Sequence, residues 1–245
     1  MEKLDIKWEF VNNRKTLYQA FLSCKKTFWE EELDPYEWWV EDFETTINWT
    51  NKYPYYCLLW FYNNKVIAWI SWNIFNINNL EVAWIWYLWV DKLSSMQLKW
   101  IWTFLVKKVE DFILNNSNNL GAIFLESNKD IPELKIKSSI WFWQKQNYKI
   151  IDKLNYFSPC VKFDPKSGDA LLKDVPLEFM IKIFEEKIIE KQFIKNLIST
   201  IYKEWYYQKK EDFNNINSLN KANKYIDIKL EQILNSINWE KIRTK

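Results

Sequence analysis

The chain has 245 residues and a formal net charge of +2, with 48% hydrophobic and 27% charged residues. This composition is typical of a globular protein with enough residues to form a hydrophobic core. The small net charge favours neither a nucleic-acid partner nor a membrane surface. Because the sequence has no histidine, it excludes a nucleophile relay built on histidine and a Cys/His zinc site, and no metal is expected.

Cysteine usage indicates a reducing compartment. Cys24, Cys57 and Cys160 are odd in number and widely spaced, which favours free thiols over disulfide bonds. Residues 1–5 lack an apolar signal region, and the apolar stretch 66–75 is too short to span a bilayer. We therefore expect a cytoplasmic protein without a membrane segment.

Hydrophobic periodicity predicts a mixture of strands and helices over residues 1–163. In chain order, we expect a strand at 5–11, helices at 15–28 and 34–47, strands at 55–62, 66–75 and 80–90, a helix at 97–116, a strand at 122–126, a helix at 135–146, and strands at 148–151 and 158–163. Asn63-Asn64 is a typical hairpin turn. The order predicts an α/β fold with a mixed, mostly antiparallel central sheet flanked by helices and a parallel central crossover.

The end of the chain has a different pattern. Residues 164–170 have the composition of a linker. Beyond them, apolar residues at helical spacing predict two long helices, over 176–207 and 219–237. We therefore divide the chain into a domain over 1–165 and a helical extension over 166–245. The apolar stripes of the extension must pack on this domain, on another protein or on a second copy, so a homodimer is left open.

Tryptophan and glycine depart strongly from their usual frequencies. The chain has 17 Trp and 2 Gly, whereas about 17 Gly are expected at a usage of roughly 7%. Most of the Trp lie within residues 1–165, in places where we expect turns and close approaches of the backbone, which are glycine sites. The opal codon is read as Trp in some genetic codes and as Gly in others. We hypothesise that most of these Trp are glycines encoded by UGA; a Trp-rich carbohydrate binder is the alternative.

One segment then becomes a candidate phosphate-binding loop. With glycine at positions 100 and 102, residues 97–102 read Gln-Leu-Lys-Gly-Ile-Gly between a strand and a helix. A helix N-terminus presents N–H groups and a positive dipole end, and glycine lets the backbone approach a pyrophosphate. No Lys-Ser/Thr pair follows, and a third glycine is missing, so neither a P-loop NTPase nor a dinucleotide fingerprint is favoured.

In this position the loop resembles the Gln/Arg-x-x-Gly-x-Gly/Ala signature of the GNAT superfamily of acetyl-CoA-dependent N-acetyltransferases, with Gln97, Trp100 and Trp102 at the signature positions. Residues 139–148 are similar to the family's helix ending in Ala-x-x-Phe-Tyr-x-Lys-x-Gly-Phe, and Leu125-Glu126 resembles the Leu-Glu of its fifth strand. The resemblance covers residues 1–163 and leaves the helical extension outside it.

The resemblance implies an acetyl-CoA site. The strand around 88–90 would align the thioester arm, and backbone N–H groups from 98–103 would hold the pyrophosphate. The residues expected to bind the cosubstrate are Leu88, Trp89, Val90, Gln97, Leu98, Lys99, Trp100, Ile101, Trp102, Thr103, Phe142 and Trp143.

The catalytic groups are less well matched. The Tyr that often acts as the family's general acid aligns with Trp143, and its frequent fourth-strand Glu falls near Trp84. Glu81, Tyr87 and Glu126 are the substitutes that we consider as general base or acid. A single acidic or phenolic side chain in a strand is often structural, and that reading applies to each of them.

The resemblance implies direct transfer of an acetyl group from acetyl-CoA to a primary amine, without a covalent enzyme intermediate. The acceptor would be a small-molecule or peptide amine. The alternative is a non-catalytic GNAT-like scaffold with a helical partner-binding arm, which the missing carboxylate and tyrosine favour.

Overall fold

The computed structural model describes residues 6–25, 36–47, 53–91, 100–129, 139–163, 167, 169–184, 190–208 and 215–238. The chain forms two compact units. The first contains Met1–Leu125 and Ile183–Glu185, and the second contains Glu126–Lys182 and Glu186–Lys245. No helix in the described ranges is both long enough and apolar enough to cross a membrane.

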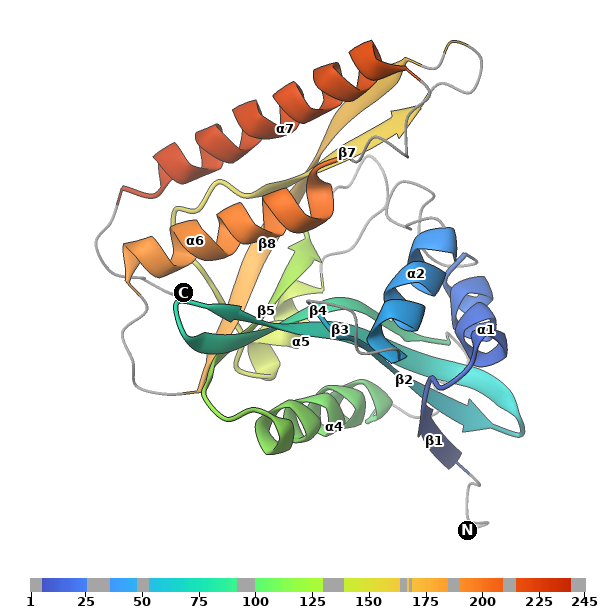
Figure 1. Ribbon diagram of the computed structural model, residues 1–245. Coiled ribbons are helices and arrows are strands. Elements are labelled where there is room, and N and C mark those ends of the chain that lie inside the picture. The colour runs from blue at the N-terminus through green and yellow to red at the C-terminus, as the bar shows by residue number, and fades with distance from the viewer. Residues whose placement is uncertain are drawn as a thin grey trace. The chain divides into compact units, whose positions relative to one another are not determined.

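The first unit is built on an antiparallel meander that is extended by a parallel strand (Figure 1). Its strands are β1 (Ile6–Phe10), β2 (Tyr55–Tyr62), β3 (Lys65–Ile77), β4 (Leu80–Val90) and the first part of β5 (Leu120–Asn128). Strands β1 to β4 pair antiparallel in sequence order, and β4 pairs with β5 in parallel. The predicted mixed sheet, antiparallel at first and parallel at the crossover, is confirmed.

Two asparagine pairs turn this meander. Asn63 (φ 50°) and Asn64 (φ 59°) join β2 to β3, and Asn78 (φ 50°) and Asn79 (φ 65°) join β3 to β4. Left-handed backbone at both central residues matches the right-handed twist of a hairpin, and asparagine tolerates it better than most residues. The turn predicted at Asn63-Asn64 is confirmed.

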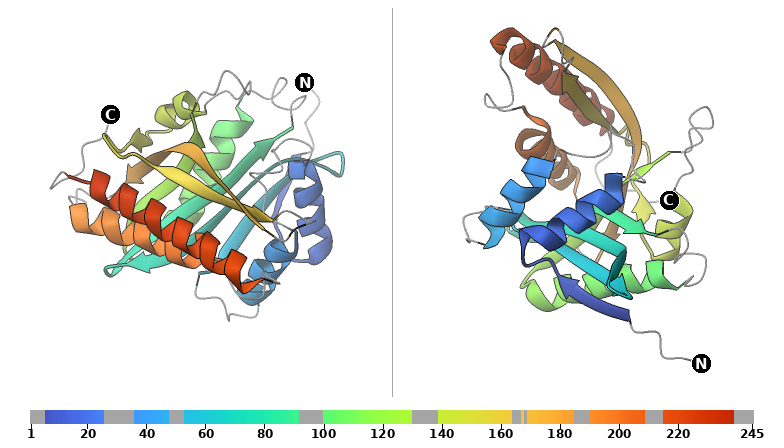
Figure 2. Two further views of the ribbon diagram at one scale, coloured as in Figure 1. Left: turned by 90° about the horizontal axis from the view of Figure 1, so that it is seen from above. Right: turned by 90° about the vertical axis from the view of Figure 1, so that its right-hand side faces the viewer.

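Of the described helices, three cover the two faces of this sheet (Figures 1 and 2). Helices α1 (Arg14–Lys25) and α2 (Tyr36–Ile47) lie on one face, and α4 (Ile101–Asn116) lies on the other. Side chains alternate between the faces along a strand. The core under α1 and α2 therefore takes one set of residues, namely Leu17, Ala20, Cys24, Trp39, Phe43, Tyr55, Cys57, Leu59, Trp69 and Trp89.

The face under α4 takes the alternate strand residues. The ring of Trp60 meets Phe104 of α4 with centroids 4.8 Å apart, and the ring of Trp72 meets Phe112 at 5.5 Å. Phe10 of β1 also contacts Phe112, at 4.9 Å. Helix α4 is therefore fixed to the sheet along its length, which in turn fixes the position of its first turn.

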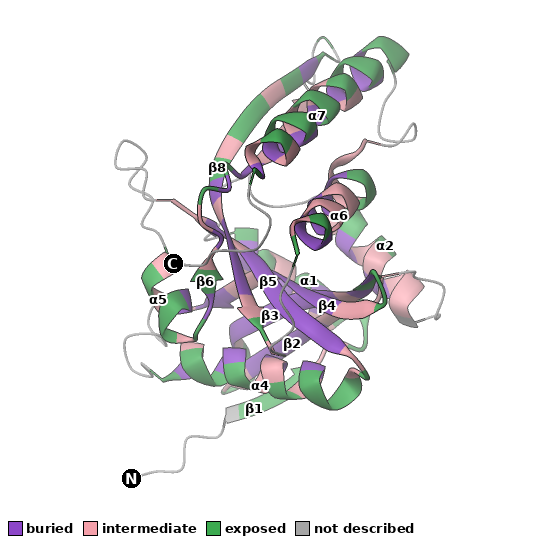
Figure 3. Ribbon diagram, turned by 90° about the vertical axis from the view of Figure 1, so that its left-hand side faces the viewer, coloured by how far each residue is buried: buried purple, intermediate pink, exposed green. Residues whose placement is uncertain are grey.

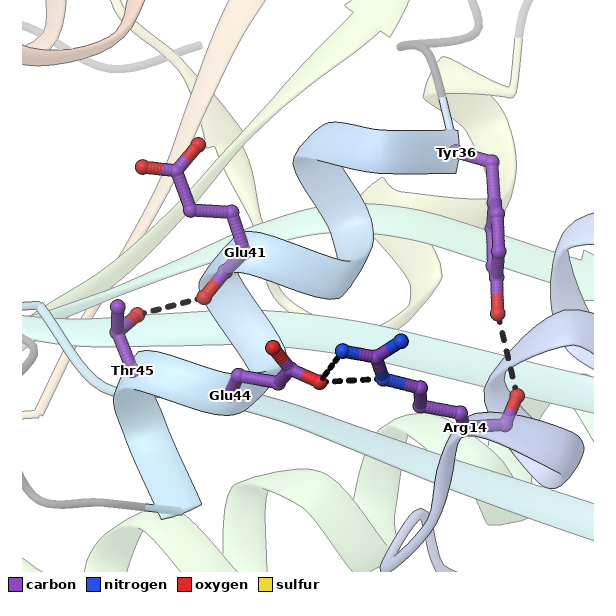
Figure 4. A network of polar contacts seen from close by, with 5 residues as sticks. All are labelled: Arg14, Tyr36, Glu41, Glu44 and Thr45. Atoms are coloured by element: carbon purple, nitrogen blue, oxygen red, sulfur yellow. Dashed lines mark hydrogen bonds and ion pairs between the residues drawn. The ribbon is translucent and has the colours of Figure 1, made fainter.

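Polar contacts join α1 to α2 (Figure 4). The guanidinium of Arg14 donates to the carboxylate of Glu44. The hydroxyl of Tyr36 donates to the carbonyl of Arg14 at 3.2 Å; within α2, the hydroxyl of Thr45 donates to the carbonyl of Glu41 at 2.8 Å. Because the Arg14 and Glu44 side chains are largely exposed, this ion pair orients the two helices more than it stabilises them.

The second unit contains β6 (Lys149–Ile150), β7 (Phe157–Phe163) and the long strand β8 (Ala170–Ile183), which pairs antiparallel with both of them. Its helical elements are α5 (Ile140–Lys145), α6 (Lys191–Ile201), the π-helical turn η2 (Tyr202–Tyr206) and α7 (Ile216–Ser236). Buried and exposed positions alternate along α7 (Figure 3). The stripe of Leu219, Ala222, Ile226, Leu230 and Ile233 is buried, as the helical spacing predicts.

The predicted helix over 176–207 is wrong in its first part. Residues 176–183 belong to β8, and among the described residues of this span only α6 and η2 are helical. A short apolar run such as Phe179-Met180-Ile181 fits a buried strand as well as a helix. Pairing with β7, which begins at Phe157↔Pro176, decides in favour of the strand.

The Trp of the described strands do not lie at turns, one of the two kinds of place expected for them. Trp60, Trp69, Trp72, Trp84 and Trp89 are buried inside β2, β3 and β4. Among the described non-glycine residues, left-handed backbone occurs only at asparagines and one lysine. Asparagine therefore takes over the turn positions at which glycine is common.

Candidate functional site

Strand β4 continues past the end of its register with β5. The parallel register runs from Glu81↔Leu120 to Ile85↔Leu125, whereas β4 extends to Val90. On its other side the register with β3 skips Trp86, which is the extra residue of a β-bulge. The indole of Trp86 donates to the side-chain carbonyl of Asn73. The bulge therefore lies just before the stretch predicted to align the thioester arm.

In that stretch the side chains pack into the protein. Trp89 and Val90 are buried, and Leu88 is half-buried. A ligand lying along this end of β4 would therefore meet mainly backbone. Peptide groups at a strand edge can bind an extended ligand in the way that they bind another strand.

The first turn of α4 is the second part of the predicted cosubstrate site. Trp100 precedes the helix (φ −80°, ψ −15°), and its side chain makes no capping hydrogen bond. This turn is fully described and holds no acidic residue. Ile101 is buried, Trp102 is half-buried and Thr103 is exposed. A helix N-terminus that has no side-chain capping hydrogen bond from its N-cap residue and no acidic residue in its first turn can bind an anion.

The indole of Trp100 stands at this helix start. It is 47% exposed, and its ring lies edge-on to Phe104 with centroids 5.6 Å apart. The other loop residues predicted to bind, Gln97, Leu98 and Lys99, lie outside the described residues.

Glu126 has the most distinctive environment of the three catalytic candidates. It lies on β5, directly after Leu125, and is half-buried in the second unit. Its Oε1 accepts from the hydroxyl of Tyr156, and the hydroxyl of Tyr206 donates to Oε2 at 2.8 Å and to Oε1 at 3.1 Å. Two phenols therefore converge on one carboxylate from distant parts of the sequence.

Burial raises the pKa of Glu126 to about 7, although the hydrogen bonds from Tyr156 and Tyr206 lower it. Burial also raises the pKa of each of these tyrosines well above its ordinary value, so both stay protonated and act as donors. A carboxyl group that titrates near neutral pH can take a proton and release it again, as a general base must.

The other two candidates have contacts of a structural kind in the first unit. The Glu81 carboxylate accepts from the backbone N–H of Asn118 at 3.0 Å and so ties down the turn that enters β5. The ring of Tyr87 contacts Trp39 at 5.5 Å and Trp69 at 5.8 Å. Glu81 and Tyr87 stand toward opposite ends of β4.

Helix α5 carries the last two predicted cosubstrate residues. Phe142 is half-buried, whereas Trp143 is buried edge-on against Tyr148 at 5.2 Å. Asn147 follows with φ 66°. This asparagine occupies the Gly position of the quoted family motif, where a left-handed residue is needed.

Sequence reasoning missed Tyr156 and Tyr206. Neither belongs to the quoted family motifs, and Tyr206 lies 80 positions from Glu126. In an amphipathic segment, the sequence around a tyrosine does not show whether its hydroxyl donates to a carboxylate or lies on the surface. Only the packing of α6 and η2 with the residues around Tyr156 brings them together.

Comparison with known proteins agrees with this architecture. Residues 15–131, which run from α1 to the end of β5, match the model of the Acetyltransferase (GNAT) family. No curated protein matches the sequence.

Similar solved structures include a GCN5-related glucosamine N-acetyltransferase region of a fungal multi-domain GH3 β-N-acetylglucosaminidase (13% identity, 68% of this chain and 20% of that chain, TM-score 0.50). Another is Arabidopsis thaliana Naa50 with a bisubstrate analogue (18% identity, 73% of this chain and 99% of that chain, TM-score 0.49). A third is a Streptococcus agalactiae acetyltransferase (14% identity, 73% of this chain and 98% of that chain, TM-score 0.48). At these identities the likeness concerns the fold. The protein has the fold of a GNAT acetyltransferase.

Proposed function

We propose that the protein is an N-acetyltransferase that moves an acetyl group from acetyl-CoA to a primary amine. The observation that carries the proposal is Glu126, a half-buried carboxyl group with a pKa of about 7. It supports a general base in a chain whose residues 15–131 match an acetyltransferase family. Glu81 and Tyr87 remain secondary candidates.

Acetyl-CoA would be held by backbone groups. The end of β4 at Leu88–Val90 supports the pantetheine arm, and the start of α4 at 100–103 supports the pyrophosphate. The proposed loop also includes Gln97, Leu98 and Lys99. Phe142 and Trp143 of α5 complete the residues proposed to bind acetyl-CoA. None of these contacts needs a metal ion.

The proposed chemistry is a single displacement. Glu126 removes a proton from the acceptor ammonium group, and the neutral amine attacks the thioester carbonyl. The new C–N bond forms as the C–S bond breaks, and coenzyme A leaves as the thiolate. The proton that the nitrogen loses on acylation passes to solvent or to the thiolate.

The acceptor belongs to the proposal only as a class. The similar fungal region is described as a glucosamine N-acetyltransferase, which acts on an amine of a small molecule. We propose a small-molecule or peptide amine, without a nucleic-acid or membrane partner, in the cytoplasm. A homodimer remains a prediction for sedimentation analysis.

The test uses release of free thiol from acetyl-CoA with a panel of amino sugars, aminoglycosides, polyamines and peptides. We expect turnover that rises with pH through about 7 and falls by about 10²-fold or more in Glu126→Gln. Glu178→Gln is the matched control, because Glu178 pairs with Lys129 instead. Binding of acetyl-CoA without turnover on any amine would favour the scaffold function.

The scaffold alternative has one observation in its favour and one against it. Trp143, at the position of the family's frequent Tyr, is buried and has no acidic group. The partner-binding arm, however, would need an open apolar face, and the stripe of α7 is already buried within the second unit. The enzyme is therefore the better supported of the two.

The proposal extends to the identity of the tryptophans. The indole N–H groups of Trp60, Trp69 and Trp72 are buried without a hydrogen-bond partner among the described residues. Buried indole nitrogens ordinarily find one. These sites support glycine, read from UGA codons, as the residue of the natural protein. Ordinary Trp codons at positions 100 and 102, or an intact mass from the native host near 30.2 kDa, would contradict it.

A further inference from the structure

The π-helical turn η2, which follows directly on α6, contacts Glu126 through Tyr206. The backbone N–H of Tyr207 donates to the carbonyl of Tyr202 at 3.0 Å, a five-residue step that interrupts the α-helical pattern. Such turns are rare and occur often at functional sites. Here the turn carries two tyrosines whose rings contact each other with centroids 5.2 Å apart.

The two tyrosines of η2 have different hydrogen-bond acceptors. Tyr202 is fully buried, and its hydroxyl donates to the backbone carbonyl of Phe157. Tyr206 donates to the Glu126 carboxylate, at 2.8 Å to Oε2. Of the two hydroxyls, only that of Tyr206 therefore reaches the carboxylate.

The carboxylate keeps room for a substrate proton. Oε1 accepts from both Tyr156 and Tyr206, whereas among the described residues Oε2 accepts from Tyr206 alone. An ionised carboxylate oxygen offers two acceptor positions. One acceptor position on Oε2 is therefore left for a substrate group among the described contacts.

The described groups that act on Glu126 are neutral donors. Tyr156 and Tyr206 hydrogen-bond to it, and Tyr202 lies behind them against both rings, with Ser158 hydrogen-bonded to Tyr206. A phenol donor favours the ionised form moderately, whereas a lysine or arginine at the same place would favour it far more strongly and leave a weaker base.

We infer that Tyr206 is a positioning residue of the active site, which holds the Glu126 carboxylate in the orientation that accepts the amine proton. The inference rests on the proposed function and assigns Tyr206, one residue of the segment 190–208, to the active site. The family match ends at residue 131, so this contribution comes from a part of the chain beyond it.

The test compares Tyr206→Phe with Tyr202→Phe. Both variants remove one hydroxyl from the same turn and keep the ring, but only the first removes a donor to Glu126. The first readout is the pH profile of acetyl-CoA-dependent thiol release. In Tyr206→Phe we expect the acidic limb of the pH–rate profile to move up on the order of one pH unit, so that kcat is lower at pH values below this limb. In Tyr202→Phe we expect the acidic limb to stay at its wild-type pH, even if this variant unfolds at a lower temperature.

The second readout does not depend on turnover. The Glu126 carboxyl carbon is titrated by ¹³C NMR in protein labelled at glutamate, with Glu126→Gln identifying its signal. The midpoint should rise in Tyr206→Phe and stay in place in Tyr202→Phe. An unchanged midpoint in Tyr206→Phe overturns the inference, whether or not the protein is active. A raised midpoint in a protein that acetylates no amine overturns the proposed function alone.

Discussion

Glu126 binds a proton more tightly in the folded chain than in the unfolded one, because burial raises its pKa from 4.5 to about 7. The free energy of unfolding that this group contributes is therefore fully present below pH 4.5 and is lost as the pH rises through about 7. We expect wild type to lose on the order of 2–3 kcal/mol relative to Glu126→Gln between pH 4.5 and pH 8.

Urea unfolding of both proteins at the two pH values measures this difference. The stability of the Glu178→Gln variant should change with pH as that of wild type does, because the Glu178 carboxylate pairs with Lys129 and not with the groups around Glu126. Parallel stability curves for wild type and Glu126→Gln would contradict the burial of an ionisable group at position 126.

Trp100 and Trp102 place two indoles at the helix start that we assign to the pyrophosphate. Protein with Trp at both positions should bind acetyl-CoA weakly, and the double change to glycine should tighten binding about tenfold or more, by removing bulk from the approach to the helix N-terminus. Isothermal titration calorimetry measures the change. Trp141→Gly is the control, since Trp141 is 66% exposed on α5 instead. Tight binding by the Trp form would mean that the site lies elsewhere.

At the scale of the elements, α4 holds its first turn in place through an apolar face against the sheet. Leu105 is fully buried, whereas Leu114 of the same helix is 45% exposed. Leu105→Ala should cost about 2–5 kcal/mol of stability, and Leu114→Ala should cost within about 0.5 kcal/mol. Thermal and urea unfolding compare the two, and equal losses would show that this face of α4 is not the packed one.

Most elements could be predicted because local pattern and tertiary environment agree. The strand predicted at 80–90 is β4, and the helix predicted at 97–116 contains α4. Asparagine pairs mark both hairpins. The strand β8 was missed because its pairing with β7 is not visible in a local window.

The site divides in the same way. The end of β4 and the start of α4 are proposed from a loop motif, and Glu126 from its resemblance to a strand motif, and these assignments stay predictions. The hydrogen bonds to Tyr156 and Tyr206 span 30 and 80 positions, so they depend on the fold. A local pattern indicates the carboxyl group but not the phenols that hydrogen-bond to it.

At the scale of the whole chain, the division at 165/166 stays a prediction, and the structure indicates where to test it. Strands β7 and β8 pair across this boundary from Phe157↔Pro176 to Phe163↔Ala170. Deleting 168–245 removes the partner of β7 and leaves an unpaired edge. We therefore expect that truncated protein to aggregate or to lose cooperative unfolding.

A cut after residue 208 separates the roles of the C-terminal helices, because it removes α7 and keeps η2. We expect it to expose the apolar surface under α7 and lower the melting temperature, while acetyl-CoA-dependent activity at low temperature persists. Differential scanning calorimetry and thiol release measure the two effects. Loss of activity in a folded protein would instead make α7 part of the site.

The asparagine turns have a consequence for producing the protein in other hosts. Asn63-Asn64 and Asn78-Asn79 shape the meander without glycine, and asparagine codons mean the same whether the opal codon is read as Trp or Gly. The chain reversals that set the order of β2, β3 and β4 are therefore insensitive to the host's genetic code. A misread gene would form its hairpins correctly and, if the proposed site is right, fail at the helix start that we assign to the cosubstrate, giving a protein that folds in part but is inactive.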